Sequence, residues 1–133
     1  MIFVMANPIP EIDPLLAKQI KPDAIIATGR SDYPNQINNV LGFPYIFKGA
    51  LIARAKCINE AMKLAAANAL AELAREEIPT QLKAELEKIH QRKFEFGKEY
   101  IIPSPFDTRL KSFISNAVAQ AAIDSGVARI KSI

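Results

Sequence analysis

The stretch Ala24-Ile25-Ile26-Ala27, followed at once by Thr28-Gly29, decides the fold. It is the second of two short apolar runs, and the first, residues 2–6, ends at Asn7. Continuous rather than alternating apolar runs are typical of strands buried on both faces, as in parallel sheets. A helix is predicted between them, beginning at the N-cap residue Asp13 with a proline in its first position. The order strand, helix, strand predicts a parallel pair and an α/β fold.

Polar residues follow both predicted strands. Asn7 comes after the first strand, and the loop from Thr28 to Asn39 comes after the second. In open parallel sheets ligands bind at the carboxyl ends of the strands, so we expect Asn7, Asn38 and Asn39 to face one pocket. Adjacent amides suit a small, oxygen-rich ligand, because an amide both donates and accepts hydrogen bonds. The alternative is an ordinary turn whose asparagines bind the local backbone.

The rest of the chain is predicted to be mainly helical. One helix is expected over residues 43–54, and Asn59 is expected to cap the next. The apolar stripe of that second helix comprises Met62, Ala65, Ala66, Ala69, Leu70 and Leu73, which we assign to the core. A charged amphipathic helix follows over residues 81–91, with Leu82, Leu86 and Ile89 facing inward.

Three further expectations concern the second half of the chain. Residues 88–94 are predicted to form the solvated end of a helix, and His90, the only histidine, is expected to face solvent. Asp107 is expected to cap the last helix, and Gly126 to end it. The apolar stripe predicted for this last helix comprises Leu110, Phe113, Ile114, Ala117, Val118 and Ala121.

Composition limits the class of protein. The 133 residues are half apolar and 23% charged, which is typical of one globular domain. The net charge of +3 comes from scattered lysines and arginines, so we expect no nucleic-acid partner. No apolar run is long enough to cross a bilayer, and no secretion signal is present, so we expect no membrane association. The single cysteine, Cys57, cannot form an internal disulfide, which favours the reducing cytoplasm.

The chain lacks the motifs that carry most catalytic chemistry. Its five glycines do not have the spacing of a dinucleotide fingerprint or a phosphate loop. Metal-ligand spacing and a hydrolase triad are also absent. Two strands buried on both faces rarely support a domain alone, so we expect a larger sheet. Its other strands are expected on an upstream segment, a separate chain or another copy.

Several motifs together resemble the carboxyl-terminal part of the cofactor-binding domain of a bacterial-type malic enzyme. The resemblance covers nearly the whole chain. The matching stretches are residues 3–8, 10–12, 22–36, 38–44, 47–51, 58–60, 62–66, 99–103 and 105–107. The resemblance implies an α/β fold. The chain would form the C-terminal portion of a Rossmann-like doubly wound parallel sheet, followed by a mainly helical C-terminal part. Residues 1–133 would form a partial NAD(P)-binding domain, with strand-helix-strand and substrate loop in 1–40 and helices in 41–133.

Malic enzymes oxidatively decarboxylate L-malate to pyruvate and carbon dioxide with NAD or NADP and a Mg or Mn ion. The resemblance implies that Asn7 approaches the nicotinamide side of the cofactor and that Asn38 and Asn39 hydrogen-bond malate. The family's catalytic tyrosine and lysine, its metal ligands and its glycine-rich turn all precede the matched region. The resemblance therefore implies no catalytic residue and no metal ligand in this chain.

Two functions of different classes follow. The first is a fragment or separately encoded part of a malic enzyme, inactive alone, that needs the upstream part of the enzyme and forms a homo-oligomer as the family does. The alternative is a catalytically inactive remnant that acts as an interaction or assembly module through its apolar sheet edge and alanine-rich helix.

Overall fold

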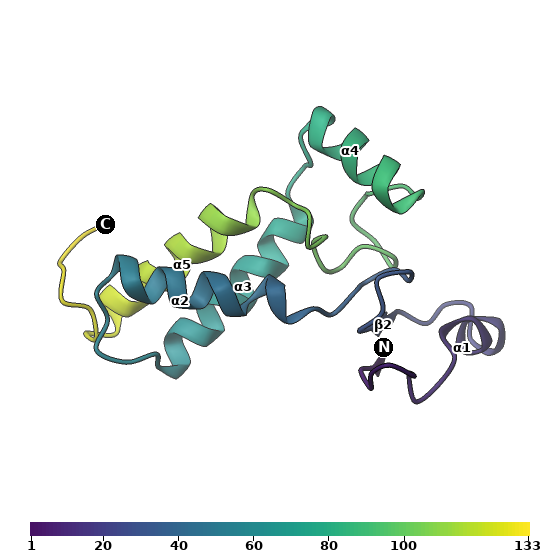
Figure 1. Ribbon diagram of the computed structural model, residues 1–133, viewed down its shortest axis with the longest axis horizontal. Coiled ribbons are helices and arrows are strands. Elements are labelled where there is room, and N and C mark those ends of the chain that lie inside the picture. Colours follow the sequence, from purple (N-terminus) through teal and green to yellow (C-terminus); the bar gives the residue numbers. More distant parts are fainter. The chain divides into compact units, whose positions relative to one another are not determined.

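The computed structural model describes residues 1–133 and contains two short strands, five α-helices and one 3-10 turn (Figure 1). Strand β1 (Ile2–Val4) and strand β2 (Ile26–Thr28) are parallel, with Val4 opposite Thr28. Helix α1 (Pro14–Ile20) connects them. The Asp13 side chain accepts a hydrogen bond of 2.8 Å from the backbone N–H of Leu15, so the predicted N-cap is confirmed. The predicted α/β fold and the parallel pairing are therefore confirmed.

The prediction that both strands are buried on both faces holds for Ala27 and Thr28 of β2 but is wrong for β1. Val4 and Ala27 are buried, but Phe3 is 51% exposed and Met5 is 56% exposed. The three large apolar side chains on α1, Leu15, Leu16 and Ile20, are also exposed. The sheet contains only β1 and β2, and no element of this chain covers Phe3 on β1. The apolar run at residues 2–6 therefore includes side chains that no part of this chain buries.

The chain divides into two compact units. The first comprises residues 1–38 and 74–106, and the second comprises residues 39–73 and 107–133. The predicted division of the chain at residue 40 concerns the order of elements and stays a prediction. Each unit has its own buried residues.

The first unit holds helix α4 (Thr80–His90) and an apolar cluster beneath it. The cluster comprises Ile78, Leu82, Leu86, Phe94 and Tyr100. Leu82 and Leu86 face inward as predicted, but Ile89 is 53% exposed, which corrects its assignment. The predicted solvated helix end is confirmed for Lys88 and Gln91, which are exposed, but not for Phe94, which is buried with its ring 5.2 Å from that of Tyr100.

His90 is also more enclosed than the sequence predicts. One ring nitrogen lies 3.0 Å from the Ser104 hydroxyl, and its ring lies 5.3 Å from that of Phe94 and 5.7 Å from that of Phe106. Burial, and secondarily the positive charge of Arg92, lower the pKa of His90 below its ordinary value of 6.5. The lone histidine therefore packs in the first unit instead of facing solvent.

We expect acid to destabilise the first unit through His90. Its pKa is lower in the folded chain than in the unfolded chain, so the unfolded chain binds more protons between the two values. The contribution of His90 to stability is complete above its ordinary pKa of 6.5 and decreases as the pH falls below that value. Thermal unfolding of the chain and of His90→Gln between pH 5 and 8 checks this. A decline in stability that is the same in both proteins would contradict it.

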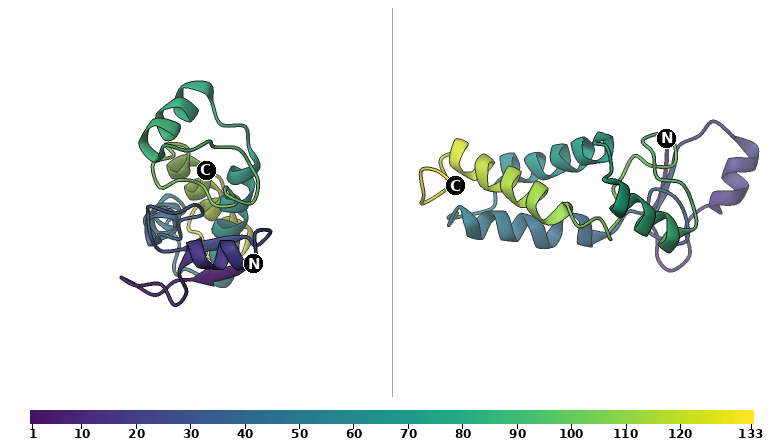
Figure 2. Two further views of the ribbon diagram at one scale, coloured as in Figure 1. Left: turned by 90° about the vertical axis from the view of Figure 1, so that its right-hand side faces the viewer. Right: turned by 90° about the horizontal axis from the view of Figure 1, so that it is seen from above.

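The second unit consists of helices. A 3-10 turn (Asn39–Leu41) leads into α2 (Phe43–Ile52), and α3 (Glu60–Arg75) and α5 (Leu110–Asp124) follow. α2 packs directly against α5, and α3 lies alongside them (Figure 2). The predicted cap of α3 is confirmed, because Asn59 Oδ1 accepts from the Met62 backbone N–H at 3.0 Å. Gly126 has a φ of 73°, as expected of a residue that ends a helix.

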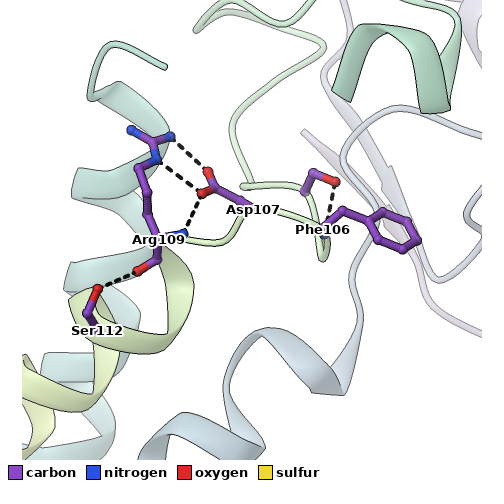
Figure 3. A network of polar contacts seen from close by, with 5 residues as sticks. Phe106, Asp107, Arg109 and Ser112 are labelled. Atoms are coloured by element: carbon purple, nitrogen blue, oxygen red, sulfur yellow. Dashed lines mark hydrogen bonds and ion pairs between the residues drawn. The ribbon is translucent and has the colours of Figure 1, made fainter. Parts of the chain in front are cut away.

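The start of α5 differs from its prediction. The Asp107 carboxylate does not cap the first turn but binds Arg109, the residue just before it (Figure 3). Asp107 Oδ1 accepts from the Arg109 backbone N–H at 2.9 Å and from Nε at 3.0 Å, and Oδ2 accepts from Nη2 at 2.8 Å. Because the Asp107 side chain is completely buried, this two-pronged pair balances its charge. None of the helices is both long enough and apolar enough to cross a membrane.

Candidate functional site at the strand ends

The two strands end at the same edge of the sheet. Val4 pairs with Thr28, so the chain that leaves β1 and the chain that leaves β2 start from neighbouring positions. The Ala6 backbone N–H donates to a Glu11 carboxylate oxygen at 3.2 Å, which ties down the segment that carries Asn7. The Asn7 side chain is exposed. This is the edge at which open parallel sheets bind ligands.

Asn7 reaches the second strand end at Gly29. A Cβ atom at position 29 would lie 3.0 Å from both the Nδ2 and the Oδ1 atoms of Asn7. The amide therefore occupies the space that the missing side chain of Gly29 leaves. The sequence places both residues at strand ends, but it does not reveal this contact, because the contact depends on the register of the strands.

The loop after β2 is held to the sheet by its backbone. The Ile37 N–H donates to the Thr28 carbonyl at 2.8 Å, and Thr28 and Gln36 form a parallel bridge. Near its start, Asp32 binds Arg30 through Nε–Oδ1 and Nη2–Oδ2 distances of 2.8 and 2.6 Å. That hydrogen bonding lowers the pKa of the Asp32 carboxyl below its usual 3.8. Asp32 therefore stays ionised at neutral pH and is a poor proton acceptor.

Asn35 has a role that the sequence did not predict. It is buried, and its Nδ2 donates to the carbonyls of Ile26, at 3.0 Å, and Lys98, at 2.8 Å. Its Oδ1 accepts from the Ile101 N–H at 2.9 Å. One amide thus joins β2 to a segment more than sixty residues away. For this residue the alternative interpretation of the loop, asparagine bound to backbone, describes the structure.

The predicted malate-binding pair lies at the end of the loop. Asn38 is half-buried and is the last residue of this part of the first unit, whereas Asn39 is exposed and begins the 3-10 turn of the second. The contact between the two strand ends is that of Asn7 with Gly29. The joint use of Asn7, Asn38 and Asn39 on one ligand stays a prediction.

The chain has no group of three or more histidine, cysteine, aspartate or glutamate side chains that fits a metal ion. Its own residues at the strand ends are amides, a glycine and one arginine-bound carboxylate. Such a set suits hydrogen bonding to a neutral amide or to carboxylate oxygens more than it suits proton transfer.

A parallel strand pair that presents amides at its carboxyl edge matches the ligand-binding edge of an open α/β sheet. Residues 2–99 match the family model described as malic enzyme, NAD binding domain. The chain belongs to this family, as the sequence motifs predicted.

Individual relatives agree. An NADP-dependent malic enzyme from Halomonas elongata is 59% identical over 97% of this chain and 30% of that protein. An NAD-dependent malic enzyme from Rhizobium meliloti is 55% identical over 96% of this chain and 16% of that protein. The crystal structure of malic enzyme from Pyrococcus horikoshii has a TM-score of 0.77 and 45% identity, covering 97% of this chain and 25% of that chain. The chain thus spans less than a third of the length of these relatives.

Proposed function

We propose that this chain supplies substrate and cofactor contacts to an NAD(P)-dependent malic enzyme, which converts L-malate to pyruvate and carbon dioxide. The observation that carries the proposal is the Asn7 amide seated against Gly29 at the carboxyl edge of the parallel strands. Membership of the malic enzyme NAD-binding family supports it.

The strand edge suits the nicotinamide end of the cofactor. The side chain of Asn7 offers a neutral donor and acceptor, which matches the two hydrogen-bonding groups of a carboxamide. Gly29 keeps the space that this amide needs. When bound, NAD or NADP accepts the hydride that leaves the hydroxyl-bearing carbon of malate. In this proposal Asn7 fixes the orientation of the ring, and this chain carries out no proton transfer.

Malate is assigned to the end of the loop. Asn38 and Asn39 would donate N–H groups to malate carboxylate oxygens and accept from its hydroxyl without adding charge to the site. The bond between Thr28 and Ile37, one residue before Asn38, holds the loop in register with the strand that carries Gly29. This chain by itself has no group of three or more side chains that could hold a metal ion. We assign Mg or Mn ligation and the catalytic acid and base to the upstream part of the enzyme.

The uncovered side of the strands supports a role within a larger assembly. Phe3 and Met5 are exposed in this chain, although their types and spacing suit a buried strand. We propose that further strands of the enzyme cover them and that the complete enzyme is a homo-oligomer. The free, exposed thiol of Cys57 is consistent with the reducing cytoplasm.

The same uncovered surface favours a second candidate, an interaction or assembly module without catalysis. Both candidates predict that the purified chain alone does not reduce NADP in the presence of malate. They differ in what happens when the chain stands inside a complete enzyme, because only the first requires Asn7 and Asn38 to act on ligands.

A chimera separates the two. Residues 1–133 replace the matching segment of the Halomonas elongata enzyme, and malate-dependent NADP reduction is measured. We expect Asn7→Ala to raise the KM for NADP about tenfold, because a hydrogen-bonded contact at the nicotinamide is lost. The matched control is Asn116→Ala, an exposed asparagine on α5. Equal KM values for NADP in the two substituted chimeras would contradict the assignment of Asn7.

A further inference from the structure

A hollow of about 430 Å³ lies at the C-terminal end of α2, within the second unit. Phe47, Leu51 and Ile58 contribute apolar surface to it, and the arginines Arg54 and Arg129 also line it. Pockets that bind small molecules have about 300 to 1,000 Å³ and combine apolar walls with a few polar groups. The hollow has that size and that composition, and the strand-end site does not use it.

Backbone hydrogen bonds bring the two arginines together from distant parts of the chain. The Arg129 N–H donates to the Ala53 carbonyl at 3.1 Å, and the Lys56 N–H donates to the Val127 carbonyl at 2.9 Å. These two bonds fix the C-terminal segment beside the end of α2, where both lie in Figure 1. The backbone positions of Arg54 and Arg129 at the same hollow are therefore a property of the fold.

Arg54 occupies a backbone conformation that normally favours glycine. Its φ is 49°, in the left-handed region, just after the helix ends. A non-glycine residue held in this region costs on the order of 1 kcal/mol or more. Glycine is the usual residue at this position of a helix end. The backbone conformation favours glycine at position 54, yet the residue there is an arginine whose side chain lines the hollow.

The side chains of the two arginines are not needed to end the helix, because backbone groups bind its last carbonyls. The carbonyls of Gly49, Ala50 and Leu51 accept from the backbone N–H groups of Ala53, Ala55 and Arg54, respectively. The four ion pairs of the structure also leave out both arginines. Two guanidinium groups beside an apolar surface thus have no acidic partner in the chain.

We propose that this hollow binds a small organic anion that has an apolar body and an oxyanion head. The two guanidinium groups would hold the oxyanion with charge-assisted hydrogen bonds, for which arginine has a suitable planar fork. Phe47, Leu51 and Ile58 would cover the apolar body. The hollow shares no lining residue with the strand ends, and the proposal does not depend on malate oxidation.

The first test uses 1-naphthyl phosphate as the probe. Cys57, the only cysteine, is exposed and lines the hollow, so the rate of its alkylation by iodoacetamide reports occupancy. We expect 1-naphthyl phosphate to slow alkylation saturably. We expect 1-naphthol and inorganic phosphate each to need at least about tenfold higher concentration, since each lacks one half of the contacts. 1-Naphthoate separates a phosphate-specific site from a general oxyanion site. Lack of protection, or equal protection by 1-naphthol, would overturn the proposal.

The second test uses substitutions. Arg54→Gly and Arg129→Gln are each expected to weaken binding of 1-naphthyl phosphate about tenfold or more, because each removes a charged donor. Arg54→Gly is also expected to keep or raise the melting temperature, since glycine tolerates the φ of 49°. The matched control is Gln91→Gly. Gln91 has a φ of 52° at the end of α4, and it does not line the hollow. Unchanged binding in both arginine variants would overturn the proposal.

Discussion

Asn35→Ala is expected to lower the free energy of unfolding of the first unit by about 3 kcal/mol. The substitution leaves the carbonyls of Ile26 and Lys98 and the N–H of Ile101 without their partner. Each buried, unpaired polar group costs about 1 to 3 kcal/mol, although water that enters the site reduces the total. The φ of 54° at Asn35 adds a further cost, because alanine tolerates this region less well than asparagine. Denaturant unfolding measures the change.

Two companion variants make the test of Asn35 specific. Asn35→Gly removes the amide but tolerates the backbone conformation, so its difference from Asn35→Ala reports the cost of the φ angle less the greater entropy of glycine in the unfolded chain. Gln36→Ala is the control, because the neighbouring amide makes only a 3.5 Å contact with the Gly29 carbonyl. Hydrogen exchange at the Ile101 N–H gives a local reading. If that N–H stays as protected in Asn35→Ala as in the unchanged chain, the account of Asn35 is wrong.

Gly49→Ala is expected to destabilise the second unit by about 2 kcal/mol. A Cβ at position 49 would lie 2.6 Å from the Ser115 carbonyl oxygen and 2.6 Å from the Val118 Cβ, so α2 and α5 would have to move apart. Alanine normally stabilises a helix relative to glycine by up to about 1 kcal/mol. Overpacking of a close contact costs about 1 to 3 kcal/mol, and a backbone oxygen cannot rotate away, so the steric cost exceeds the gain.

Gly42→Ala is the matched control for this substitution. A Cβ there would meet only Ile46 Cδ1, at an ordinary distance of 3.7 Å. Its effect on the melting temperature is expected to be small. If Gly49→Ala melts at the same temperature as Gly42→Ala, the close approach of α2 and α5 does not limit what position 49 accepts.

The local elements were predictable from the sequence because short-range rules determine them. The Asp13 cap and the Asn59 cap follow from residue type and position alone. The parallel pairing of β1 with β2 follows from the length of the connection. The family followed from the motifs around the loop, and the family model confirms it.

The contacts between distant segments were not predictable. The buried role of Asn35 depends on residues 98 and 101, which no local pattern connects to it. The enclosure of His90 by Ser104 and Phe106 likewise depends on how the chain returns to α4. The exposure of Phe3 was not predictable either. An apolar run predicts that a strand is buried, but it does not show which segment covers the strand.

The most direct test of the assignment of malate to the loop compares kcat/KM for malate in two chimeras. The measured quantity is kcat/KM of the chimera that carries Asn38→Ala divided by kcat/KM of the unsubstituted chimera. The loss of a hydrogen bond to a charged carboxylate predicts a ratio of about one tenth or lower, with the KM for NADP unchanged. The unsubstituted chimera must reduce NADP with malate, and Asn116→Ala must leave this activity unchanged. A ratio near one in an active chimera would contradict the central claim that this loop recognises malate.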